Sequence, residues 1–189
     1  MYLRRKIDDY LTQWKNNENR YPLIIKGARQ IGKTESVKHF ADRNYESVVS
    51  INFALEKQFQ MILSDGYDVE NIIKNISLID PSKKFIANRT LIIFDELQEL
   101  PDIATSLKAF KLDGRFDVIC SGSLLGINYK KIHSNSVGYK TDYEMFSMDF
   151  EEFLWALDND TLMDFIRLCF EEKKPMGQVL HRKTMDYVR

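Results

Sequence analysis

Residues 27 to 34 read Gly27-Ala28-Arg29-Gln30-Ile31-Gly32-Lys33-Thr34, which is the G-x-x-x-x-G-K-T pattern of a P-loop. Its two glycines let the backbone turn tightly and bring N–H groups close to an anion. The lysine adds a point charge for phosphate groups, and the threonine hydroxyl suits a divalent cation. The residues expected to bind a nucleotide are therefore Gly27, Ala28, Arg29, Gln30, Ile31, Gly32, Lys33, Thr34 and Glu35.

The surroundings of this loop match the motif. Residues 21–26 read as a short buried strand, and residues 34–42 read as a helix with Val37, Phe40 and Ala41 on one face. Such a helix directs the positive end of its dipole at the phosphates. The alternative is a glycine-rich turn that binds nothing, and the strand–loop–helix context argues against it.

A second segment, residues 90–96, ends in two carboxylates. Four consecutive apolar residues precede Asp95 and Glu96, as in a central parallel strand, and parallel sheets bind ligands at the carboxyl ends of their strands. We expect Asp95 to hold Mg²⁺ together with Thr34, and Glu96 to orient or deprotonate the attacking water. Without the upstream P-loop, a solvated acidic loop is the simpler interpretation.

The next strand, residues 116–120, is followed by Ser121-Gly122-Ser123. A small polar residue here can sense the γ-phosphate or hold the attacking water, and Ser121 is the first choice, with Ser123 second. Turn chemistry explains Ser-Gly-Ser equally well. The candidate catalytic residues are thus Glu96, Lys33 and Ser121.

The remaining periodicity predicts an α/β fold. Helices are expected over residues 2–16, 34–42, 55–63, 69–79, 103–113, 161–172 and 177–189, with strands over 21–26, 47–53, 90–96, 116–120 and 139–146. Asp149 and Glu152 have the spacing of a capping box. Alternating strands and helices favour a parallel sheet covered on both faces. We expect a three-layer P-loop core over 1–157 and a short C-terminal helical appendage over 158–189.

Composition restricts the class of protein. The 189 residues are 44% hydrophobic and 29% charged with a net charge of −1, which suits a folded domain and gives no global attraction to nucleic acid. No apolar run is long enough to span a bilayer, and the N-terminus lacks a secretory signal. Two distant cysteines fit buried thiols in the cytoplasm. Lys130 and Lys131 beside Tyr129 are a nucleic-acid candidate, although a solvated face explains them more simply.

Several of these stretches together resemble the AAA-like ATPases of bacteria and archaea that carry a C-terminal domain of unknown function. The similarity is most specific in Gly27–Thr34 and in Asp149-Phe150-Glu151-Glu152-Phe153-Leu154. It extends to Ile51-Asn52-Phe53, to Phe94-Asp95-Glu96-Leu97-Gln98, to Ser121-Gly122-Ser123 and to Val137-Gly138.

The resemblance implies a five-stranded parallel sheet in which the Asp-Glu strand is not paired with the P-loop strand. It also implies ATP, Mg²⁺ and slow hydrolysis. Many relatives have Gly-Arg where this chain has Gly138-Tyr139, so an arginine acting on the γ-phosphate is not carried over, and Lys140 replaces it only as a point charge. Relatives continue into a C-terminal domain that this sequence lacks, so we expect a designed piece, a fragment or a truncated gene product.

Two functions follow from these features. The first is an ATPase, and the alternative is a nucleotide-dependent switch whose state a C-terminal domain or protein partner reads. A GTPase is disfavoured because no Asn/Thr-Lys-x-Asp motif reads guanine, and a small-molecule kinase because no Arg-rich lid is evident. An oligomer is compatible with the fold class, a DNA partner rests on fold analogy alone, and no membrane partner is expected.

Overall fold

A computed structural model describes residues 2–123 and 138–188. The chain divides into two compact units, one formed by residues 7–147 and the other by residues 1–6 together with 148–189. The division falls nearer the N-terminus than the expected boundary at residue 157, because the helix after Ser147 groups with the C-terminal helices. The domain boundary itself stays a prediction.

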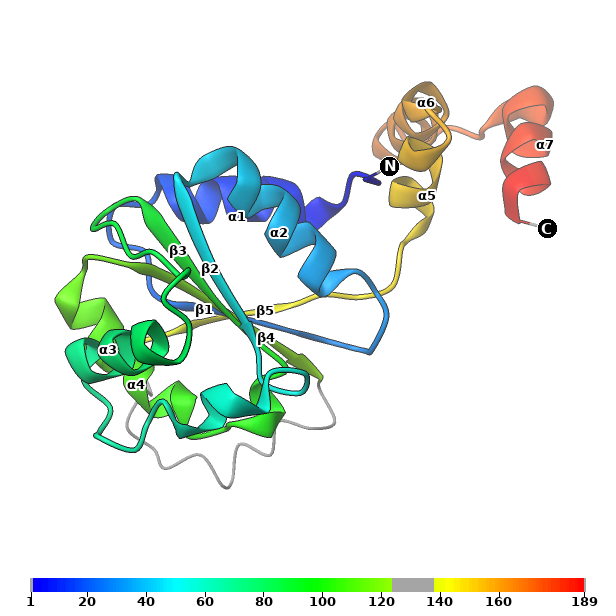
Figure 1. Ribbon diagram of the computed structural model, residues 1–189. Helices are drawn as coiled ribbons and strands as arrows, with labels where there is room; N and C mark the ends of the chain where they lie inside the picture. The colour runs from blue at the N-terminus through cyan, green and yellow to red at the C-terminus, as the bar shows by residue number, and fades with distance from the viewer. Residues whose placement is uncertain (1, 124–137, 189) are drawn as a thin grey trace. The chain divides into compact units, whose positions relative to one another are not determined.

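The larger unit is built on one five-stranded parallel sheet (Figure 1). Its strands are β1 (Leu23–Gly27), β2 (Ser47–Asn52), β3 (Thr90–Asp95), β4 (Asp117–Ser123) and β5 (Thr141–Glu144). Their order is β2-β3-β4-β1-β5, and every neighbouring pair is parallel. The expected α/β fold is confirmed, and β3 is separated from the P-loop strand β1 by β4, as the resemblance implied.

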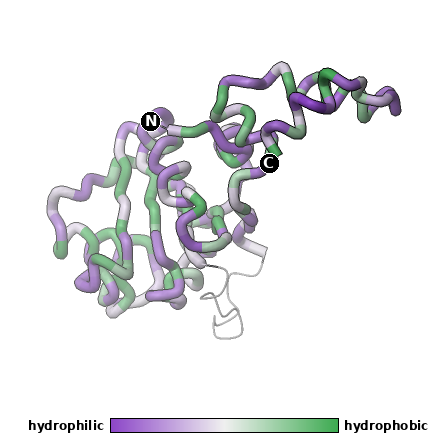
Figure 2. The backbone as a smooth tube through the Cα atoms, turned by 90° about the vertical axis from the view of Figure 1, so that its right-hand side faces the viewer, coloured by the Kyte–Doolittle hydropathy of each residue, from purple (hydrophilic) through white to green (hydrophobic). Residues whose placement is uncertain are grey.

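Alternation along the strands creates the three layers. On β3, Leu91 and Ile93 pack on α1 (Lys6–Asn16) and α2 (Lys33–Asn44). The intervening Ile92 and Phe94 pack on α3 (Val69–Ile79) and α4 (Ile103–Asp113). Both faces of a central strand are therefore apolar, which explains its unbroken hydrophobic sequence. Figure 2 shows hydrophobic stretches along the strands of this unit.

Short helical turns follow two of the strands at the carboxyl edge. The stretch 55–63, expected as a helix, contains the 3-10 helix η1 (Lys57–Met61), which fixes Phe59 in the core. A second 3-10 helix, η2 (Leu97–Glu99), follows β3 and is anchored by the buried Leu97. Both turns at the carboxyl edge are thus anchored by a side chain that is buried in the core.

The smaller unit holds α5 (Phe150–Ala156), α6 (Asp160–Glu171) and α7 (Gly177–Val188). The capping box of α5 is confirmed: Asp149 accepts from the backbone of Glu152, whose side chain accepts from the backbone of Asp149. Glu152 is buried and also pairs with Arg5 at 3.1 Å. The N-terminal segment is therefore tied to α5 by charge.

The two cysteines differ in burial. Cys120 is fully buried in β4, and burial raises the pKa of its thiol to about 12, whereas Cys169 on α6 is only partly buried.

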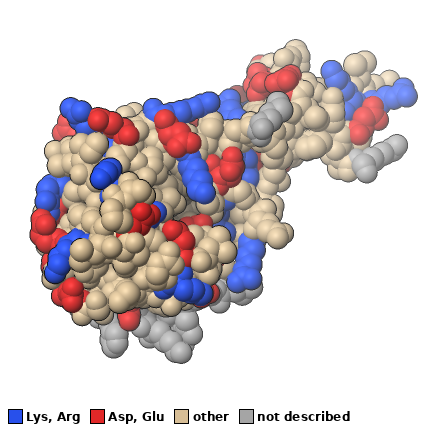
Figure 3. Space-filling view, in the orientation of Figure 1, with Lys and Arg blue, Asp and Glu red and all other residues tan. Residues whose placement is uncertain are grey.

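Lys and Arg side chains are interspersed with Asp and Glu on the face in Figure 3. Tyr129, Lys130 and Lys131 lie outside the described residues. Within 2–123 and 138–188, no helix is long and apolar enough to cross a membrane.

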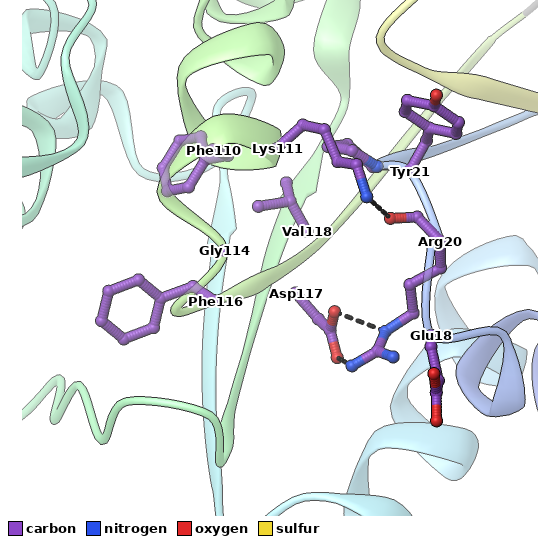
Figure 4. Close-up of a pocket in the computed structure, with 10 residues that line it drawn as sticks. Glu18, Arg20, Tyr21, Phe110, Lys111, Gly114, Phe116, Asp117 and Val118 are labelled. Carbon is purple, nitrogen blue, oxygen red and sulfur yellow. Dashed lines mark hydrogen bonds and ion pairs between the residues drawn. The ribbon is translucent and has the colours of Figure 1, made fainter.

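A partly buried ion pair joins Arg20, which precedes β1, to Asp117 at the start of β4 (Figure 4). The Asp117 carboxylate accepts two hydrogen bonds from Arg20, at 2.7 and 2.9 Å, and one from the Tyr45 hydroxyl at 2.8 Å. Burial, reinforced by the charge of Asp117, raises the pKa of Tyr45, so this hydroxyl keeps its proton. Three donors therefore depend on one carboxylate.

Replacing Asp117 by asparagine is expected to destabilise the larger unit. The amide keeps the volume but loses the charge and one acceptor, which leaves Arg20 or Tyr45 without a full partner at a cost of about 1–3 kcal/mol. Urea unfolding measures this cost. The matched control is Glu46→Gln, which breaks the exposed 2.8 Å pair with Arg89 and should cost about 0–1 kcal/mol. Equal costs for the two variants would contradict the prediction.

Candidate active site

The P-loop connects β1 to α2 at the carboxyl edge of the sheet. Gln30 and Gly32 have positive φ angles of 62° and 94°, which turn the chain back toward the sheet before α2 begins at Lys33. No side chain caps the first turn of α2. Its N–H groups therefore face the loop with the positive end of the helix dipole, the usual arrangement for binding an anion.

The Lys33 ammonium lies inside the loop. It donates to the carbonyl oxygens of Gly27 at 3.0 Å and Ala28 at 2.6 Å. Partial burial lowers the pKa of Lys33, and the nearby charges of Glu96 and Asp95 oppose that shift. The side chain is thus held by neutral carbonyl groups, which a phosphate oxygen can replace as a stronger partner.

Asp95 at the end of β3 is the centre of a hydrogen-bond network. Its Oδ2 accepts from the Thr34 hydroxyl at 3.0 Å and from the Asn52 amide at 3.1 Å. Its Oδ1 accepts from the Ser121 hydroxyl and from the backbone N–H of Glu96 at 3.0 Å. Asp95 is 4% exposed, so four donors replace the water that burial removes from its carboxylate.

Glu96 follows in a left-handed backbone conformation, with φ 57° and ψ 51°. One of its carboxylate oxygens accepts from the side-chain amide of Gln98. The carbonyl end of the same amide accepts from the backbone N–H of Ser123, at 3.3 Å. Gln98 therefore joins Glu96 to the last residue of β4.

The P-loop and the residues that follow β3 line one cavity of about 630 Å³, within the range of small-molecule sites, about 300–1,000 Å³. Of the residues expected from sequence, the cavity is lined by Arg29, Gln30, Gly32, Lys33, Thr34, Glu35, Asp95 and Glu96. Gly27, Ala28 and Ile31 do not line it: the first two hold Lys33, and Ile31 packs on the core. The P-loop and the Asp-Glu strand thus meet at a single site.

The two serines at the end of β4 have different surroundings. Ser121, the first choice for the γ-phosphate, is fully buried, and its hydroxyl reaches Asp95 rather than the cavity. Ser123, the second choice, lines the cavity. Direct contact of Ser121 with a substrate stays a prediction, while the geometry connects Ser121 to the site through Asp95.

Sequence reasoning assigned no role to Asn52 or Gln98. Asn52 ends β2 directly beside Asp95 in the register of β2 and β3, so its position at the carboxyl edge was a usable signal. Gln98 lies on η2, where neither strand nor helix periodicity indicates the direction of a side chain. Both are polar partners of the two carboxylates.

The chain matches the model of a known protein family. The model of a family described as "AAA domain" matches residues 19–154, most of the chain. The chain belongs to this AAA family. The matched range contains the P-loop, the Asp-Glu strand and the capping box of α5, and the AAA domain accordingly has a nucleotide-binding, ATPase-like function. A comparison with curated proteins finds no match.

Solved structures show similarity at low identity. A DNA replication initiation factor is 12% identical with a TM-score of 0.47, covering 95% of this chain and 53% of that one. PCH-2 of C. elegans is 13% identical with a TM-score of 0.44, covering 88% and 47%. Drosophila ORC bound to DNA is 13% identical with a TM-score of 0.47, covering 74% and 89%. The AAA domain spans about half the length of the first two.

Proposed function

We propose that this AAA domain binds ATP and hydrolyses it with Mg²⁺. The observation that carries the proposal is the meeting of two elements distant in sequence: Thr34 of the P-loop lies 3.0 Å from the Asp95 carboxylate, in a cavity also lined by Lys33 and Glu96. Phosphoryl transfer to water requires a loop that binds the phosphates, oxygen ligands for the metal ion and a group that positions the water. The P-loop, the Thr34–Asp95 pair and Glu96 match these three requirements.

The donor set suits Mg²⁺. This ion prefers oxygen ligands and is usually held by one or two carboxylates with substrate phosphates and water. Thr34 and Asp95 supply a hydroxyl and a carboxylate, and the donors from Asn52 and Ser121 fix the orientation of Asp95. Bound there, Mg²⁺ would neutralise charge on the β- and γ-phosphates. We infer that Ser121 acts through Asp95.

Glu96 is the proposed general base. It accepts a proton from a water whose oxygen forms a bond to the γ-phosphorus. The bond between that phosphorus and the bridging oxygen breaks, and the electron pair leaves with ADP. Lys33 stabilises the negative charge of the phosphate oxygens. The N–H groups at the start of α2 bind the remaining oxygens.

A nucleotide-dependent switch is the second candidate. Among the described residues that line the cavity, the arginine is Arg29, which belongs to the P-loop itself. Arginine fingers accelerate hydrolysis by about 10³–10⁵-fold when a second element supplies them. A partner, a second copy or a C-terminal domain would then complete the site. Such partners, nucleic acid and a cytoplasmic location stay predictions.

Loss of the Lys33 charge tests the proposed function. We expect wild-type protein to bind ATP and release phosphate in a Mg²⁺-dependent manner, and Lys33→Ala to bind ATP about 10- to 100-fold more weakly, since a charged hydrogen bond contributes about 1.5–3 kcal/mol. Lys38→Ala, on the exposed side of α2, is the control. Binding without phosphate release would favour the switch, and unchanged binding by Lys33→Ala would reject the nucleotide site.

A further inference from the structure

The side chain of Gln98 bridges the residue that follows β3 and the last residue of β4. Its amide nitrogen donates to the Glu96 carboxylate, and its carbonyl oxygen accepts from the N–H of Ser123. Both ends of one carboxamide are therefore used, one on the proposed general base and the other on the last residue of β4.

Glu96 needs such a partner because little else in its own segment fixes its side chain. Its backbone is left-handed, so the side chain leaves the end of β3 at a turn rather than along a strand. A glutamate has three rotatable side-chain bonds, and a base must stay within hydrogen-bond reach of the water it deprotonates. One carboxylate oxygen bound by Gln98 removes most of that freedom and leaves the other oxygen to accept a proton.

The turn that carries Gln98 is itself fixed. Leu97 is fully buried in the core, and the N–H of Glu99 donates to the carbonyl of Glu96 at 2.9 Å. The neighbouring Glu99 is exposed, also lines the cavity and pairs with Lys57 at 3.0 Å. Gln98 is thus the η2 residue that donates to Glu96, and it does so from a turn that is fixed by the core.

We propose that Gln98 is a positioning residue that holds Glu96 for hydrolysis and links its orientation to the end of β4. The inference rests on the proposed ATPase function. Because the carboxamide is anchored on the Ser123 backbone, a movement at the end of β4 changes the direction from which Gln98 holds Glu96. The end of β4 thereby controls the base through one side chain.

Two variants separate positioning from space filling. Gln98→Glu keeps the shape and the acceptor for Ser123 but presents an acceptor, not a donor, to Glu96. We expect both Gln98→Glu and Gln98→Ala to lower kcat by roughly 10- to 100-fold while KM for ATP changes less than about twofold, the pattern of a misplaced catalytic group. Gln60→Ala, which removes another amide donor near this edge, is the control. Normal kcat in Gln98→Glu would overturn the proposal.

A second measurement does not depend on turnover. In ¹⁵N NMR spectra, the side-chain amide signal of Gln98 is assigned by its absence in Gln98→Glu. We expect this signal to shift and to exchange faster with water in Glu96→Ala, whereas the Gln60 signal stays unchanged. An unaltered Gln98 signal in Glu96→Ala overturns the contact. If wild-type protein releases no phosphate while the signal depends on Glu96, hydrolysis is rejected and the link between Gln98 and Glu96 stands.

Discussion

Glu96→Gln protein is expected to bind ATP with nearly wild-type affinity and to lose turnover by about 10²–10⁴-fold, the contribution of a positioned general base. Glutamine has the same size and still lines the cavity, but its amide does not take a proton from water. The groups proposed to bind phosphate, Lys33 and the start of α2, are untouched. This variant should therefore keep ATP binding and lose turnover. ATP titration measures the first property, and phosphate release measures the second.

The control for Glu96→Gln is Asp102→Asn. Asp102 is exposed, belongs to the same β3–α4 connection and does not line the cavity. It should leave both binding and turnover unchanged. Retention of more than about a tenth of the wild-type rate by Glu96→Gln would assign the proton to another group, since a general base that contributes so little lies below the usual range.

The positions of the strands were accessible from sequence for a physical reason, whereas the separation of β3 from β1 was implied by the family resemblance. Buried parallel strands need apolar side chains on both faces, so Leu91–Phe94 stood out, and the P-loop fixed where β1 ends. Asp95 and Thr34 were predicted to meet because both lie at carboxyl ends of the same sheet. The network confirms that proximity at 3.0 Å, while the chemical roles of both residues remain proposals.

The direction of side chains at strand ends was not accessible. Ser121 and Ser123 lie two residues apart on β4, and their different surroundings depend on the register between β3 and β4. Phe94 pairs with Cys120, which places Ser121 beside Asp95 and Ser123 two residues farther along, where the strand ends at the cavity. Because both strands are apolar on both faces, their hydrophobic pattern alone does not determine that register.

Gly27 links the stability of the sheet to the shape of the P-loop. A Cβ atom at this position would lie 2.3 Å from the carbonyl oxygen of Met145 and 2.6 Å from Cδ1 of Ile31. The N–H of Met145 donates to the carbonyl of Lys26 at 2.7 Å, so the neighbouring backbone is held in place by β1 itself. Because the closest atom belongs to the backbone, rotation of a side chain does not relieve the contact.

We therefore expect Gly27→Ala to destabilise the larger unit by about 3 kcal/mol or more, at the upper end of overpacking effects. The added methyl group should push the end of β5 away from β1. This movement should also displace the loop carbonyls that hold Lys33 and weaken ATP binding. Gly114→Ala is the matched control, since Gly114 has φ 72° with open space around it and should cost only about 1–2 kcal/mol of left-handed strain. Urea unfolding compares the two. If Gly27→Ala loses less free energy of unfolding than Gly114→Ala, the prediction is wrong. The backbone at the end of β1 would then move to make room for the methyl group, and the close approach of Met145 would not limit the residue at position 27.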